Sequence, residues 1–259
     1  MVRPPAVAGS FYPADPADLA QAVDALLPTS APDQPPPKAI IVPHAGYEYS
    51  GPVAGAAYSL LTPDVDAMRV VLVGPAHFHP LEGVAVSGAD ALATPLGPVE
   101  VDDEARTAVL VLSVVQRDDA PHEPEHSLEV QLPILQRLLG PFRILPLVTG
   151  RAVAPADLAA VLDAVWGGTE TVVVCSSDLS HYHDHDTATA LDRRTASAVV
   201  DRDVEGIGSR DACGAVAIRG LLEAARRRDL PVRLLDLRTS HDAGGPRDRV
   251  VGYGAFAVG

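Results

Sequence analysis

The sequence predicts an α/β fold, and two observations support this prediction. Short apolar runs rich in valine, isoleucine and leucine alternate with segments of helical periodicity along most of the 259 residues. The runs at 39–42, 70–73 and 171–175 are apolar except for Thr171, which is typical of parallel strands buried on both faces. The final two strand-like runs of the chain, 232–237 and 250–258, follow each other with no helix between them. We therefore expect a single domain over residues 1–259, with a mixed, largely parallel sheet and helices on both faces.

End signals and periodicity locate the elements around these strands. A helix is expected over 15–27, because Asp15 can cap it and Pro16 fits its first position. The proline-rich stretch 29–37 predicts a loop. Leucines spaced three or four apart predict a helix over 127–139, which Pro133 should kink. Further helices are expected at 52–61, 103–112, 155–165, 187–200 and 214–228, further strands at 83–86, 143–148, 232–237 and 250–258, and a turn at 94–98.

Composition narrows the classes of function and location. The net charge of −14 disfavours nonspecific binding to nucleic acid or to an anionic membrane. The first residues contain no apolar signal core, and no window approaches the roughly 18 apolar residues of a spanning helix. Two cysteines, Cys175 and Cys213, make no secreted-type disulfide framework. We expect a cytoplasmic protein with two free thiols, Cys175 being a buried small apolar residue.

Three of the strand-like runs lead into a histidine set among small, turn-forming residues. The first run is followed by Pro43-His44-Ala45-Gly46, the second by Gly74-Pro75-Ala76-His77, and the third by Ser176-Ser177-Asp178-Leu179-Ser180-His181. Ligands of open α/β sheets bind beyond the carboxyl ends of the strands. Imidazole is the commonest protein ligand for a transition metal. The pattern therefore predicts a shared metal-binding crevice, although each histidine alone also suits a capping or core role.

Asp178 and His181 are expected to assist the chemistry of this crevice. They are three residues apart, so a helical turn would place them on one face. A carboxylate beside an imidazole raises its basicity and fixes its tautomer, as a general acid–base requires. The alternative is that Asp178 caps a helix.

The residues suggest a metal site of two imidazoles and one anionic donor. His44 and His77 would bind, with either Cys213 or Asp178 as the third ligand. Cys213 precedes a predicted helix, whose N-terminus favours the thiolate, although an inert packed thiol is the alternative. This donor set suits non-haem Fe(II), while a thiolate also favours copper or zinc.

The segment 123–129 carries another polar cluster. Glu125, His126 and Glu129 are close in sequence, and His126 and Glu129 are predicted to support the metal ligands. The spacing is not that of the His-Glu-x-x-His zinc proteases, because no second histidine follows. His126 can equally have a structural role at a helix start.

Taken together, these segments resemble the Memo family, also described as protein B of the AmmeMemoRadiSam system. The resemblance spans nearly the whole chain. It is carried by Arg3-Pro4-Pro5-Ala6-Val7-Ala8-Gly9-Ser10-Phe11-Tyr12-Pro13, Pro43-His44-Ala45-Gly46-Tyr47, Gly74-Pro75-Ala76-His77, Thr94-Pro95-Leu96-Gly97, Glu125-His126-Ser127-Leu128-Glu129, Ser176-Ser177-Asp178-Leu179-Ser180-His181, Cys213-Gly214 and Val251-Gly252-Tyr253.

The resemblance implies a fold similar to class III extradiol dioxygenases (LigB-like), in which two histidines and a carboxylate hold non-haem iron. In Memo proteins a cysteine replaces that carboxylate, so the metal ligands fall on His44, His77 and Cys213, with Asp178 and His181 beside them. A surface for a peptide or small molecule would include Phe11 and Tyr49, matched by aromatic character alone. An AmmeMemoRadiSam A protein and a radical-SAM protein are implied as partners.

Three functions follow from these observations. The first is a metal-dependent, dioxygenase-like oxidoreductase that uses iron or copper, with His181 moving protons. The second is a binding module for a peptide or metal that retains the fold without the chemistry. The third is a cysteine hydrolase that uses Cys213 with His181.

Overall fold

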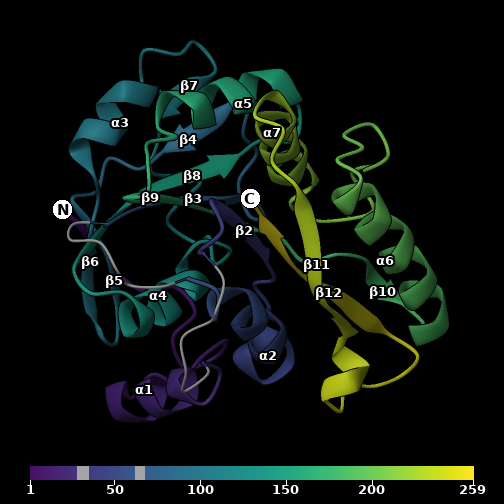
Figure 1. The fold of residues 1–259 in the computed structure, drawn as a ribbon. Coiled ribbons are helices and arrows are strands. Elements are labelled where there is room, and N and C mark those ends of the chain that lie inside the picture. The colour runs from purple at the N-terminus through teal and green to yellow at the C-terminus, as the bar shows by residue number, and fades with distance from the viewer. Residues whose placement is uncertain (28–34, 62–67) are drawn as a thin grey trace.

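A mixed sheet runs through the middle of the computed structural model, which describes residues 1–27, 35–61 and 68–259 (Figure 1). Nine strands of the described chain belong to it, in the order β10-β12-β2-β9-β3-β8-β4-β7, with β11 paired to β12. Residues 29–34 of the predicted loop 29–37 lie outside the described residues. The predicted α/β fold class is confirmed.

The centre of the sheet is parallel, and on each side the next strand runs antiparallel to it. The parallel strands are β2 (Ala39–Val42), β9 (Thr171–Ser176), β3 (Met68–Pro75) and β8 (Phe142–Thr149). On one side β4 (Val84–Val86) runs antiparallel to β8 and parallel to β7 (Val115–Arg117). On the other, β12 (Val250–Val258) pairs antiparallel with β2, β11 (Val232–Thr239) and β10 (His181–His183).

Helices cover both faces of this sheet, as continuous apolar strands require. On one face pack α3 (Asp103–Val109), α5 (Pro155–Ala164), α6 (His185–Val200) and α7 (Ala215–Arg227). On the other pack α1 (Pro16–Asp24), α2 (Tyr47–Tyr58) and α4 (Leu132–Leu138). Alternate residues of a strand serve the two faces: Ile41 and Val71 belong to the first core, Ile40 and Val70 to the second.

A second, three-stranded sheet joins the N-terminus to a hairpin. Its strands are β1 (Val2–Arg3), β5 (Ala91–Thr94) and β6 (Gly97–Glu100), with β5 in the middle. The predicted turn at 94–98 connects the two hairpin strands, which the sequence interpretation missed. No helix of the described chain combines the length and hydropathy needed to cross a membrane.

Three elements near the expected site differ from the sequence-based expectations. Helix α2 begins at Tyr47, five residues before the predicted start, with Pro52 inside it. The segment 127–139 is not one kinked helix but a 3₁₀ turn, η1 (Glu129–Gln131), followed by α4 with Pro133 in its first turn, where a missing amide costs little. The helical turn expected to join Asp178 to His181 is wrong, because His181 begins strand β10.

Candidate metal centre

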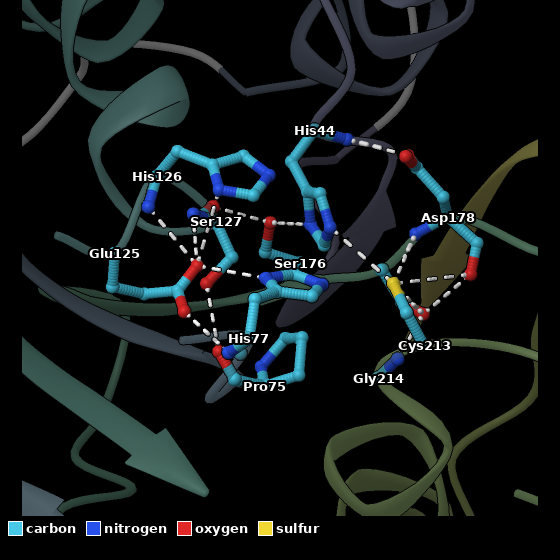
Figure 2. A network of polar contacts seen from close by, with 12 residues as sticks. His44, Pro75, His77, Glu125, His126, Ser127, Ser176, Asp178, Cys213 and Gly214 are labelled. Atoms are coloured by element: carbon cyan, nitrogen blue, oxygen red, sulfur yellow. Dashed lines mark hydrogen bonds and ion pairs between the residues drawn. The ribbon is translucent and has the colours of Figure 1, made fainter. Parts of the chain in front are cut away.

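Three imidazoles converge at the carboxyl ends of the parallel strands, but His126 takes the place beside His44 and His77 that the sequence pattern gave to His181. His44 follows β2 and His77 follows β3, each two residues past the strand end, and His126 comes from the loop before η1. One ring nitrogen from each lies within 4.8 Å of those of the other two. Figure 2 shows these rings close together, with the Cys213 sulfur beside His44. The fold thus brings together donors from distant parts of the chain.

Hydrogen bonding fixes the tautomer of His44. The Ser176 hydroxyl donates to the carbonyl of Ser127 (2.6 Å) and accepts from the Gln131 amide (2.9 Å). Its oxygen is therefore left to accept from Nδ1–H of His44 at 2.9 Å. Nε2 then carries the lone pair, which is the form that binds a metal. Burial, and next the neighbouring charge of His77, lower the pKa of His44 to about 3.

Glu125 fixes the tautomer of His77 in the same way. Its carboxylate accepts from the backbone amide of His77 (2.6 Å) and from Nδ1 (2.9 Å), and also from the amides of His126 and Ser127. These contacts outweigh the cost of burial and lower the pKa of Glu125 to about 2, so it is ionised. Nδ1 of His77 is thus the donor, and Nε2 is free. This carboxylate–histidine pair is typical of metal sites.

His126 lies against both of these histidines. Its ring stacks on that of His77 with the centroids 4.7 Å apart, and it meets His44 edge-on at 5.4 Å. Nδ1 is buried without a hydrogen-bond partner among the described residues, at 3.5 Å from the Glu125 carboxylate. Burial lowers the pKa of His126 to about 4. A neutral imidazole with an unpaired buried nitrogen is well suited to be a metal ligand, a role beyond the supporting one that the sequence predicted for it.

Cys213 contacts His44 at its Nε2 atom. Its sulfur is 3.3 Å from Nε2 of His44 and 3.3 Å from the amide nitrogen of Asp178. Helix α7 begins two residues later, at Ala215. Burial and the carboxylate of Asp178 nevertheless raise the pKa of the thiol well above its usual range. Without a cation the sulfur is therefore a thiol, and a bound metal would favour the thiolate.

Asp178 and His181 lie beside the centre on the segment after β9. Asp178 accepts from the backbone amide of His44 at 2.8 Å, and burial raises its pKa. This bond holds the loop that carries His44, so Asp178 acts here through the backbone. Nδ1 of His181 donates to the carbonyl of Leu179 at 2.8 Å, because a carbonyl only accepts. Nε2 of His181 is therefore free to accept a proton.

The remaining predicted residues have other surroundings. Glu129 is fully buried and binds Arg3 (2.7 Å), the Tyr12 hydroxyl (2.6 Å) and two amides of the N-terminal segment. It fixes that segment, which brings Phe11 to His126 with ring centroids 4.8 Å apart. Tyr49 is 37% exposed on the first turn of α2.

Sequence reasoning missed the two partners that set the tautomers, Ser176 and Glu125. Ser176 ends β9, and only the pairing of β9 with β2 brings it to His44. Glu125 was noticed only as part of a local cluster, although it lies 48 residues from His77. A buried-strand serine and an acidic residue before a histidine carry no distinctive pattern, so tertiary structure alone reveals them.

Fold and site together define a class: an α/β protein with an imidazole-rich centre, flanked by a cysteine, at the carboxyl edge of a parallel sheet. Residues 3–257 match the family model described as Memo-like protein. A MEMO1 family protein of Ignicoccus hospitalis is 38% identical over 279 residues, which cover 98% of each chain. Others of Methanopyrus kandleri and Aquifex aeolicus are each 36% identical, over 99% and 97% of this chain and 98% and 97% of their own. The chain belongs to the Memo family, as its motifs predicted.

A solved structure supports the fold independently. An uncharacterized protein of Escherichia coli K12 superposes with a TM-score of 0.54 at 14% identity, covering 85% of this chain and 99% of that one. At this identity the likeness concerns the fold alone.

Proposed function

We propose that this chain binds one transition-metal ion, iron(II) before copper or zinc, and that it is a metal-dependent oxidoreductase acting on a small oxygen-bearing molecule. His44 and His77 are the first two ligands in this proposal. His126 and the Cys213 sulfur adjoin them and complete the donor set. The observation that carries the proposal is the convergence of the three imidazoles within 4.8 Å.

The chemistry of the donors fits a metal better than it fits a purely structural cluster. Three histidines packed together gain little from one another, and burial disfavours protonating His44 and His126. Two of the rings bind an acceptor through Nδ1–H, Ser176 for His44 and Glu125 for His77, which leaves Nε2 of each ring to a cation. Nε2 of His44 lies 3.3 Å from the Cys213 sulfur. Such orientation by outer partners is a general property of metal-ligating histidines.

A bound iron(II) ion would supply activation of dioxygen and of a substrate hydroxyl. The protein's own contribution is the placement of His181. With Nδ1–H held by the Leu179 carbonyl, Nε2 of His181 can accept the proton of a substrate hydroxyl and return it later. Asp178 keeps the His44 loop in position through the 2.8 Å bond to its amide.

The test begins with protein purified and reduced without oxygen, because a thiolate and iron(II) are both easily oxidised. Metal content is measured after iron(II) loading for the native protein and for His77→Ala, with circular dichroism to confirm folding. We expect one equivalent in the native protein and a loss in the variant. Equal iron in the folded variant would contradict the site. Oxygen uptake with a series of catechols then tests the enzymatic part.

A second function, non-catalytic binding of a peptide or metal, is favoured by the exposed aromatic rings around the centre. Phe78 is 60% exposed next to His77, and Tyr182 is 64% exposed next to His181. The same experiment separates the two functions, since tight iron binding without oxygen uptake for any catechol supports the binding module.

A further inference from the structure

A cavity of about 350 Å³ adjoins the metal centre on the side of His77. Residues 76–81, which follow β3, and residues 150–151, which follow β8, form its walls. His77 belongs both to this cavity and to the imidazole cluster. A molecule bound here would therefore lie next to the proposed ligand set, at the carboxyl edge of the sheet where α/β proteins bind ligands.

Close backbone contacts hold the second wall in place. The amide of Gly150 donates to the carbonyl of Gly83 at 2.8 Å, and the amide of Ala76 donates to the carbonyl of Thr149 at 3.2 Å. A side chain at position 150 would overlap the carbonyl of Leu81, so only glycine allows this approach. Arg151 follows directly and is a lining residue of the cavity.

The charge of this cavity is opposite to that of the molecule. The chain carries 34 acidic residues against 20 basic ones, yet no carboxylate lines this cavity. Its ionisable lining residues are His77, His79 and Arg151. Within the described chain Arg151 forms no hydrogen bond or ion pair, whereas arginines such as Arg69, Arg106 and Arg228 are paired with carboxylates. The guanidinium is thus available to an anion from solution.

The other walls are apolar. Ala76, Phe78 and Leu81 contribute methyl, phenyl and isobutyl groups. A guanidinium next to an apolar surface suits a molecule with an apolar body and one planar anionic group, because arginine binds a carboxylate with two parallel hydrogen bonds.

We propose that Arg151 and this cavity bind the carboxylate of a small organic acid, whose other end reaches the centre at His77. The meaning of the subsite as a substrate site depends on the proposed function, but its binding of carboxylates does not. Arg151 is thus a specificity-determining residue for an anionic substrate.

The test measures binding of benzoate by NMR chemical-shift titration, on the full chain in metal-free and zinc-loaded forms. Benzamide, which has the same shape without the charge, and inorganic phosphate, which has the charge without the apolar body, are the comparison probes. Native protein should bind benzoate about tenfold or more tightly than benzamide, as expected for a charged hydrogen bond, and more tightly than phosphate.

The variant Arg151→Gln should lose this preference and keep the native metal content, while Arg233→Gln, an exposed arginine on β11 at the other flank of the sheet, should bind as the native protein does. Absence of benzoate binding, equal binding of benzoate and benzamide, or unchanged binding by Arg151→Gln would each overturn the subsite. Because the metal-free form is included, failure of the metal centre would be seen separately as loss of metal uptake.

Discussion

At the scale of single residues, the site depends on groups that set the orientation of the histidines. Glu125 makes four hydrogen bonds around His77 and His126, and the bonds that it accepts favour the carboxylate and lower its pKa. A carboxylate accepts at both oxygens, whereas an amide of the same shape must donate from one side. Glu125 therefore determines which nitrogen of His77 is free.

The substitution Glu125→Gln should weaken metal binding by about ten- to a hundredfold, the usual effect of losing a partner that orients a ligand. Competition with a chromophoric chelator measures this affinity. Glu123→Gln, two residues away and exposed, is the matched control and should bind as the native protein does. An unchanged affinity in Glu125→Gln would show that His77 is oriented by other contacts or is not a ligand.

The sequence made some residue placements predictable and left others hidden. His44 and His77 were predictable because a short apolar run followed by Pro-His or Gly-Pro-x-His marks a strand end, and parallel strand ends share one edge. The place of His126 against both rings was not predictable from the sequence. The loop before η1 reaches these rings only when the strands of the sheet have packed. Local patterns report strand ends, whereas contacts between loops depend on the completed sheet.

At the scale of elements, the segment from β9 to β10 is held by α6 and β12. The amide of Ser180 donates to the buried carboxylate of Asp192 on α6 at 3.0 Å, and Leu179 and Ser180 exchange backbone hydrogen bonds with Gly252 of β12. A side chain at position 252 would overlap the Asp192 carboxylate. The segment that carries Asp178 and His181 is thus fixed from two sides.

Replacing this glycine tests the arrangement. Gly252→Ala should lower the free energy of unfolding by about 1–3 kcal/mol, the range for overpacking a dense core. Because the overlap is with Asp192, the double variant Gly252→Ala/Asp192→Ala should be less destabilised than the sum of the two single variants, as measured by urea unfolding. Strictly additive effects would mean that the strain lies elsewhere.

The errors in element prediction have local causes. Pro52 was interpreted as the first residue of a helix, but α2 begins at Tyr47 and accommodates the proline one turn later. Pro133 was interpreted as a kink inside a helix, but it lies in the first turn of α4, where no amide is needed. The short strands β1, β5, β6, β7 and β10 have too few residues for any periodicity to show.

At the scale of the whole molecule, stability should depend on pH through buried neutral histidines. His122, outside the metal centre, is 3% exposed and donates from Nε2 to the carbonyl of Ala85 at 3.2 Å. Burial lowers its pKa from 6.5 to about 4. Between these pH values the unfolded chain takes up a proton that the folded chain refuses, so stability falls as the pH falls from 6.5 towards 4.

The difference corresponds to at most about 3 kcal/mol of unfolding free energy for His122. In His122→Gln this contribution is absent, so the native protein should lose more stability than the variant between pH 7 and pH 4. Urea unfolding of metal-free protein at several pH values measures both slopes. His183→Gln, at an exposed histidine, should follow the native slope. Equal slopes for native and His122→Gln protein would mean that His122 titrates normally in the fold.

In the proposed site, the three imidazoles and the Cys213 sulfur form one metal centre. Titration of reduced, metal-free protein with cobalt(II) tests it directly, because the visible absorption of bound cobalt reports its coordination and a near-ultraviolet charge-transfer band reports a thiolate ligand. We predict one equivalent bound with that band, loss of the band alone in Cys213→Ala, and loss of binding in His44→Ala/His77→Ala. Native protein that binds cobalt no better than this double variant would contradict this metal centre.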